Sequence, residues 1–155
     1  MVSQKASVDE FTDFVHEHES RLRHALIAAC GGEIGRDAAC EALAYGWEHW
    51  DRIKGMNNPG GYLYRVGLRR GRRLMPKRKP LFTAVDAARI PDVEPALLKA
   101  VANLSERQRT TVVLVHCFEW SLTEVGETLG LSKTTVQNHL ERGMTSLRRQ
   151  IGASK

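Results

Sequence analysis

Apolar residues recur every three or four positions along most of this 155-residue chain, and that period predicts amphipathic helices. The expected helices span residues 11–29, 37–53, 59–75, 97–104, 105–118, 121–129 and 132–151. One segment is ambiguous, because the β-branched pair Val112 and Val113 also suits a strand. Its caps and helical neighbours favour a helix, so we expect an all-α fold.

Residues with special backbone preferences mark where the first helices begin and end. Residues 1–8 are expected to form a loose start, and Asp37 is a suitable N-cap for the second helix. Asn58 followed by Pro59 is a cap and first-turn pair, which predicts the start of the third helix. Pro76 ends that helix, since proline cannot supply the backbone N–H that a helix interior needs.

The last two predicted helices have the pattern of a helix-turn-helix. Ser121, with a glutamate three residues later, matches a capping box, and Ser132 caps the second helix. Gly130 stands between the helices, where a left-handed turn favours a residue without a Cβ. Gly126 is small enough to let the helices cross closely, and Val136 supplies an apolar contact after the turn. This order and spacing is typical of DNA-binding helix-turn-helix units.

The polar side of the second helix of this pair carries the side chains suited to reading DNA. Amides pair with adenine edges, threonine methyls contact thymine, and basic groups bind phosphate or guanine. The candidates are Lys133, Thr134, Thr135, Gln137, Asn138 and Arg142. Any amphipathic hairpin also presents a polar face to water, so an ordinary solvated surface stays the alternative at this point.

Positive charge is concentrated in one short segment. The formal net charge is only +5, but residues 65–79 hold eight Lys/Arg and no acidic residue. On the third helix this segment makes an arginine-rich face, and a focused basic stripe suggests a nucleic-acid partner. A solvated helix face is the alternative, although a run of like charge destabilises a helix without a bound polyanion.

Prolines divide the chain into two parts. Four of them fall in or beside a segment without sustained periodicity, at Pro76, Pro80, Pro91 and Pro95. Such a segment is typical of a semi-rigid linker. We expect two small helical domains at residues 1–78 and 94–155, joined by a Pro-rich linker at residues 79–93.

Several classes of function lack the residues that they need. No Ser/His/Asp set, carboxylate pair, phosphate loop or metal-ligand spacing stands out, so we expect no enzyme, cofactor or metal. Cys30, Cys40 and Cys117 are odd in number and widely spaced, as reduced cytosolic thiols are. No signal peptide or membrane-spanning run is evident, so we expect a cytoplasmic protein without a membrane partner.

The C-terminal part resembles region 4 of bacterial RNA polymerase sigma factors, a promoter-recognition domain that is winged-helix-like without a wing. The matching residues are Leu104, Gln108 and Arg109, the segment 122–129, and Thr135, Val136, Leu140 and Arg142. The N-terminal part is similar to sigma region 2 through Asp37-Ala38, Glu41-Ala42, Leu43, Trp47, Trp50, Asn58-Pro59, Tyr62-Leu63 and Arg72-Arg73. Two such modules with a short linker resemble the extracytoplasmic-function (ECF) group of the sigma-70 family.

The resemblance implies a sigma factor that binds core RNA polymerase and directs it to promoter DNA. Glu41, Leu43 and Trp47 would lie on the helix that docks on the clamp of the largest subunit. From their apolar character, however, Trp47 and Trp50 are both expected to be buried. Region 4 would sit on the flap of the second-largest subunit, with its second helix in the major groove at the −35 element. An anti-sigma factor is a further partner that the resemblance allows.

At the −10 element the resemblance implies that region 2 opens the duplex and holds one strand, which requires unstacking bases and neutralising phosphates. Met56 and Asn57 would form the rim of a base pocket, and Tyr62 and Tyr64 are stacking candidates. The −10 set is Met56, Asn57, Asn58, Tyr62, Arg65, Arg69, Arg72 and Arg73. Core packing stays the alternative role for Tyr62.

A second function also stays open. A helix-turn-helix regulator that works without polymerase would bind operators as a dimer, and the N-terminal part would then sense a signal or dimerise. The basic helix after the Asn58-Pro59 cap argues against this alternative, because it has no evident sensing role.

Overall fold

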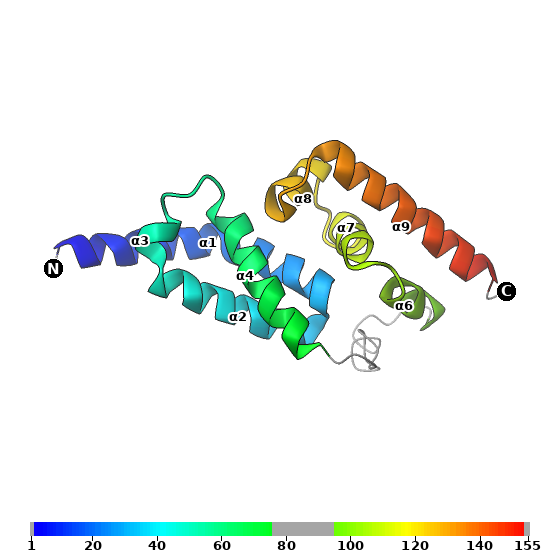
Figure 1. The fold of residues 1–155 in the computed structure, drawn as a ribbon, viewed down its shortest axis with the longest axis horizontal. Helices are drawn as coiled ribbons and strands as arrows, with labels where there is room; N and C mark the ends of the chain where they lie inside the picture. The colour runs from blue at the N-terminus through cyan, green and yellow to red at the C-terminus, as the bar shows by residue number, and fades with distance from the viewer. Residues whose placement is uncertain (1, 76–94, 154–155) are drawn as a thin grey trace.

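The computed structural model describes residues 2–75 and 95–153, and within them every regular element is an α-helix (Figure 1). The elements are α1 (Val2–Cys30), α2 (Gly32–Glu48), α3 (Trp50–Ile53), α4 (Pro59–Leu74), α6 (Pro95–Ala102), α7 (Glu106–His116), α8 (Leu122–Leu129) and α9 (Lys133–Ala153). The all-α expectation is confirmed, and Val112 and Val113 lie inside α7. The predicted linker at residues 79–93 falls outside the described residues.

Two helix starts differ from the expectation. α1 begins at Val2, because residues 2–10 contain no glycine or proline to interrupt it. α2 begins at Gly32 and not at Asp37, since Gly31 makes the turn with φ 90° and leaves Asp37 inside the helix. The early start places Gly35 against α1, where a Cβ would lie 2.5 Å from the backbone of Ile27. Glycine at this position therefore lets α1 and α2 cross at close range.

The start of α4 is as predicted. Asn58 Oδ1 accepts a hydrogen bond from the backbone N–H of Gly61 at 3.0 Å, and Pro59 occupies the first turn. The helix ends at Leu74, just before Pro76. The cap fixes the direction of the helix that carries five arginines, Arg65, Arg69, Arg70, Arg72 and Arg73.

The helix-turn-helix formed by α8 and α9 is also confirmed. Ser121 Oγ accepts from the Glu124 N–H at 3.1 Å, and the Glu124 carboxylate accepts from the Ser121 N–H at 2.8 Å. Gly130 is left-handed, with φ 71° and ψ 36°. A Cβ on Gly126 would lie 2.6 Å from the carbonyl oxygen of Leu131, so any residue other than glycine would force the backbone to shift at this crossing.

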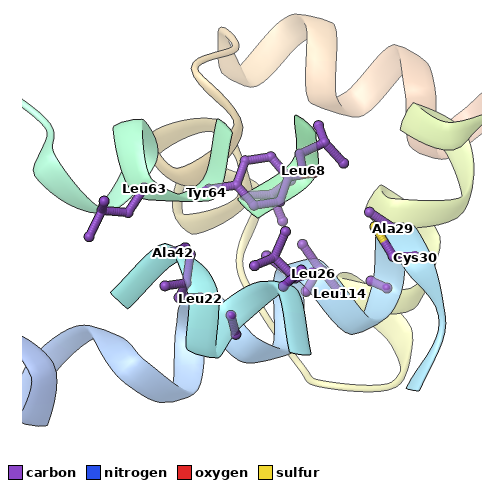
Figure 2. Packing of buried hydrophobic residues seen from close by; sticks show 14 of the residues in the cluster. Leu22, Leu26, Ala29, Cys30, Ala42, Leu63, Tyr64, Leu68 and Leu114 are labelled. Atoms are coloured by element: carbon purple, nitrogen blue, oxygen red, sulfur yellow. The ribbon is translucent and has the colours of Figure 1, made fainter. Parts of the chain in front are cut away.

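One hydrophobic core joins the two halves of the described chain. Figure 2 shows Leu22, Leu26, Ala29 and Cys30 of α1 clustered with Ala42 of α2, with Leu63, Tyr64 and Leu68 of α4, and with Leu114 of α7. The same core extends to Trp120, Val125 and Val136, while a smaller cluster holds Ala100, Leu104, Val112 and Leu147. α1 thus packs on α7, and α4 packs on α8 (Figure 1).

The core also decides which aromatic side chains are buried. Trp50 is 6% exposed, as expected, but Trp47 is 43% exposed, so its expected burial was wrong. Gly46 faces Leu63 of α4, and successive helix residues point about 100° apart, so Trp47 turns away from the core. Tyr64 is 4% exposed, and this burial rules out the stacking role suggested for it.

Candidate nucleic-acid interface

α9 presents a polar face to solvent in its first half. The exposed members of the predicted set are Lys133, Thr134, Gln137, Asn138 and Arg142. Thr135 differs, because it is half-buried and its hydroxyl lies 2.8 Å from Ser132 Oγ. Ser132 Oγ also accepts from the Thr135 N–H at 3.2 Å, so Thr135 belongs to the helix cap. The remaining five side chains share the open side of the helix.

Positive charge near α9 comes from α7 as well. Arg107 is exposed in the first turn of α7. Partial burial lowers the pKa of His139 most, and the charges of Arg107 and Arg142 lower it further. Sequence reasoning missed Arg107, because no local spacing links it to a helix that begins after the turn.

α4 carries an arginine-rich side with a pocket of about 420 Å³. The lining residues are Tyr45, Tyr62, Arg65, Val66, Arg69, Arg70 and Arg73. Those from α4 recur at steps of three and one, so they lie on one side of the helix, which we name the pocket face. Four predicted −10 residues, Tyr62, Arg65, Arg69 and Arg73, therefore meet in one place. No carboxylate of the described chain pairs with Arg65, Arg69 or Arg73.

Two groups that sequence reasoning missed complete this surface: Tyr45 of α2 lines the pocket, and Arg52 of α3 bonds to its tyrosines. Arg52 Nη2 donates to the Tyr45 hydroxyl at 2.9 Å and to the Tyr62 hydroxyl at 3.4 Å, and the two hydroxyls are 3.4 Å apart. The Arg52 guanidinium lies 5.7 Å from the centre of the Tyr62 ring, and the Arg70 guanidinium lies 5.7 Å from that of Tyr45. Hydrogen bonds from Tyr45 and then Arg52 lower the pKa of Tyr62.

A different side of α4 is engaged by the helix-turn-helix half. Arg72 Nε donates to one carboxylate oxygen of Glu106 at 2.9 Å, and Arg72 Nη2 donates to the other. Asn58 Nδ2 donates to the backbone carbonyl of Glu127 near the end of α8. Two predicted −10 residues, Asn58 and Arg72, are therefore bonded within the chain and do not line the pocket.

The remaining predicted residues lie in the α3–α4 loop and on α2. Met56 is half-buried against the core, and Asn57 is exposed. On α2, Glu41 is exposed and pairs with an arginine of the pocket face, Arg70, at 3.4 Å, whereas Leu43 is half-buried. Trp47 stands beside Phe11 of α1, with ring centroids 5.4 Å apart. The predicted polymerase-binding residues thus present one charged and one aromatic group to solvent.

A buried arginine connects the two halves. Arg109 is 5% exposed, and its guanidinium donates to the backbone carbonyls of Leu104 at 3.1 Å and Ala29 at 2.7 Å. Ala29 lies in the last turn of α1, where the helix dipole favours a cation. Burial lowers the pKa of Arg109 most, while the nearby Glu106 raises it. Burial also raises the pKa of Cys30 to about 11, so that thiol stays protonated.

Within residues 2–75 and 95–153, no group of three or more His, Cys, Asp or Glu side chains is placed to hold a metal ion. Nor is any helix in those ranges long and apolar enough to span a bilayer. All three cysteines are free thiols.

The fold and its surfaces define a class: a helical protein whose helix-turn-helix packs on a second helical module with an arginine-lined pocket. Residues 95–147 match the family model for sigma-70, region 4. The RNA polymerase sigma-E factor of Streptomyces coelicolor is 29% identical over 154 residues, covering 93% of this chain and 87% of the relative. The ECF RNA polymerase sigma factor SigW of Bacillus subtilis is 22% identical over 172 residues, covering 96% and 92%.

Solved structures share the fold. CnrH in complex with the cytosolic domain of CnrY matches with a TM-score of 0.62 at 22% identity, covering 94% of this chain and 89% of that one. The sigma factor RpoE of Bartonella quintana, in complex with the anti-sigma factor NepR, matches with a TM-score of 0.58 at 16% identity, covering 94% and 99%. Residues 95–147 thus carry a sigma-70 region 4 domain, and the chain as a whole is similar to ECF sigma factors.

Proposed function

We propose that this chain is an ECF sigma factor, which binds core RNA polymerase and directs it to a set of promoters. In this proposal α9 reads the −35 element in the major groove, and the pocket face of α4 holds one strand of the opened −10 element. The observation that carries the proposal is that one chain exposes both surfaces, on separate helices, without burying either against the other half.

The −35 role rests on the chemistry of the exposed α9 side chains. Gln137 and Asn138 can pair with base edges, and Lys133, Thr134 and Arg142 can bind phosphates or bases. Arg107 of α7 adds positive charge near these side chains, and positive charge attracts the DNA phosphates. Thr135 supports this surface by capping α9.

The −10 role rests on the pocket face. Three arginines there, Arg65, Arg69 and Arg73, have no carboxylate partner in the described chain, so their charge is available to phosphates. Tyr62 lines the same pocket and supplies a ring on which a base can stack. Asn57 is exposed nearby in the loop, while Asn58 and Arg72 serve the chain's own packing until another partner replaces their bonds.

Polymerase binding is proposed for α2, with Trp47 as its main contact on the clamp of the largest subunit. An exposed tryptophan is a common energetic centre of protein interfaces, and Trp47 is 43% exposed. The helix-turn-helix half would bind the flap of the second-largest subunit. An anti-sigma factor stays a proposed partner as well.

The decisive experiment mixes the purified chain with core polymerase that lacks its own sigma factor. Co-elution on size exclusion and run-off transcription from promoters mapped after overproduction are the expected results. If the chain failed to bind core polymerase, and instead bound duplex operators as a dimer, the proposal would be overturned.

Two substitutions test the assigned surfaces within that assay. Trp47→Ala should weaken core binding by at least about 1 kcal/mol, and Leu74→Ala is the matched control, because Leu74 is also an exposed apolar residue at 52%. Asn138→Ala should change the preference for −35 bases by about 1–3 kcal/mol. Arg148→Ala, exposed farther along the same helix, should leave that preference unchanged.

A further inference from the structure

Tyr45 lines the pocket, and its hydroxyl bonds to the neighbouring polar groups. The Tyr45 ring already has two neighbours, since the His49 ring stacks on it at 4.1 Å between centroids and the Arg70 guanidinium lies 5.7 Å from its centre. The hydroxyl instead lies 3.4 Å from the Tyr62 hydroxyl and accepts from Arg52 at 2.9 Å. Tyr45 is therefore placed to hold other groups rather than to stack on a base itself.

Arg52 joins the two tyrosines from the solvent side. It donates to both hydroxyls and lies over the Tyr62 ring, so it fixes the orientation of that ring. An exposed arginine that bonds two phenols, and no carboxylate of the part of the chain that the structure describes, differs from the usual surface ion pair. The Arg52–Tyr62 hydrogen bond and the contact between the two hydroxyls would be lost if the Tyr62 ring turned, so they favour one position of that ring.

The polar edge of this group is rich in hydrogen-bond donors. Guanidinium groups donate only, and the phenol oxygens already accept from Arg52. One phenol proton is used between the two hydroxyls, which leaves the other to donate outward. Among the described residues no carboxylate lines the pocket, and Glu41 reaches only one of its lining arginines, Arg70. A ligand that offers acceptors suits this edge, whereas one that offers further donors does not.

The arginines of the pocket face favour a strand over a lone nucleotide. Arg65, Arg69 and Arg73 recur every fourth residue, so with a rise of 1.5 Å per residue the row is about 12 Å long. A single phosphate cannot contact all three groups. Successive phosphates of one unpaired strand can, while a base stacks on the nearby ring.

We propose that Tyr45 and Arg52 are positioning residues of the −10 strand site, which hold Tyr62 for one unpaired base and make the pocket select a keto base. The pocket then prefers thymine or guanine, whose carbonyl oxygens accept hydrogen bonds. Adenine and cytosine are disfavoured, because they present an amino donor, N6 or N4, at the ring position where guanine and thymine present the carbonyl oxygen O6 or O4. This inference rests on the proposed function and deepens it.

The test uses the reconstituted holoenzyme and forked promoter DNA whose −10 non-template strand is single-stranded. Each unpaired position is changed in turn to each of the four bases, and binding is measured by fluorescence anisotropy. The wild type should prefer thymine or guanine at one position. Tyr45→Phe keeps the ring and removes the hydroxyl, so it should weaken binding about five- to tenfold there and reduce the preference.

Arg52→Gln should have the same effect on base preference, with an unchanged dependence of affinity on salt. Arg36→Gln is the matched control, because Arg36 is exposed on α2 and the substitution removes the same charge. A merely structural role would lower the unfolding midpoint without changing the base preference.

Two results would overturn the inference. One is that Tyr45→Phe keeps the full preference for thymine or guanine, or that the wild type shows no such preference. The other is a fall of about 0.7 in the salt slope for Arg52→Gln, which would make Arg52 a phosphate contact. Failure of the proposed function looks different, because the wild-type holoenzyme would then neither transcribe nor bind any forked DNA.

Discussion

Arg69 and Arg72 lie three positions apart on α4, yet the structure predicts opposite effects for their removal. Arg69 lines the pocket and has no carboxylate partner in the described chain. Arg72 makes two hydrogen bonds to the Glu106 carboxylate. We therefore expect Arg69→Ala to weaken binding to single-stranded DNA, and Arg72→Ala to reduce stability instead.

The magnitudes differ in kind. One phosphate contact on a single strand contributes about 0.7 to the slope of log affinity against log salt concentration. Between 50 and 200 mM salt, the fall in affinity of Arg69→Ala should therefore be smaller than that of the wild type by a factor of about 2.5. Arg72→Ala breaks a pair whose side chains are 56% and 26% exposed. Because water screens such a pair, we expect a loss of about 0.5–1 kcal/mol of unfolding free energy.

The assay follows anisotropy of a labelled single-stranded oligonucleotide with the full chain, across that range of salt, with urea unfolding in parallel. Glu106→Gln is the matched control, since it weakens the same ion pair and keeps Arg72. It should lose similar stability and retain at least the wild-type slope. If Arg72→Ala flattened the salt slope as much as Arg69→Ala does, that result would refute the division of α4 into the pocket face and a side that bonds to the helix-turn-helix half.

Three further predictions concern stability, each measured by urea unfolding. Arg109→Met should lower the unfolding free energy by about 2–3 kcal/mol, because the backbone carbonyls of Leu104 and Ala29 lose a charged donor. Removing the buried charge offsets part of this loss. A loss below about 1 kcal/mol would contradict the prediction. Gly35→Ala should cost at least about 2 kcal/mol, since its Cβ meets the α1 backbone at 2.5 Å, whereas Gly152→Ala meets no atom within 4 Å and should stabilise by up to about 1 kcal/mol. Burial is the main cause that lowers the pKa of His24; the charge of Arg23 lowers it further, and Glu19 raises it. The unfolded state therefore binds more protons than the folded state, so the unfolding free energy should fall as the pH drops from about 6.5 towards the lowered pKa. The His24 ring stacks on Phe118, with centroids 4.1 Å apart. His24→Phe keeps an aromatic ring there and should remove that share of the pH dependence of stability; an unchanged dependence would refute the assignment.

Features fixed by local backbone chemistry could be predicted from the sequence. The capping box at Ser121, the left-handed turn at Gly130 and the cap at Asn58 each involve residues within a few positions of one another. The same holds for the open side of α9, since its apolar stripe determines which residues remain outside. The prediction that Asp37 caps α2 was wrong, because the turn at Gly31 starts that helix five residues earlier, at Gly32.

Features that depend on packing between distant helices were not predictable in this way. Trp47 and Trp50 are both apolar and three positions apart, but α2 ends at Glu48 and α3 starts afresh at Trp50, which changes the direction of the second side chain. Likewise, Tyr45 and Tyr62 come together only because α2 packs beside α4. A sequence pattern contains no direct measure of such a pairing.

The composition of α4 suggests that strand binding also stabilises the fold. Gly67 and Gly71 face Leu26 and Cys30, where a Cβ would lie 2.6 Å from each side chain, so α4 fits closely on the core despite its weak helix formers. Its arginines repel one another, which costs further stability that a polyanion would restore. A single-stranded oligonucleotide at about 100 times its Kd should therefore add about 2.7 kcal/mol to the unfolding free energy at low salt. Replacing Arg65, Arg69 and Arg73 by glutamine should raise the unfolding free energy without DNA and abolish the stabilisation by the oligonucleotide. A variant that lost stability while keeping the full response to DNA would show that the strand binds elsewhere.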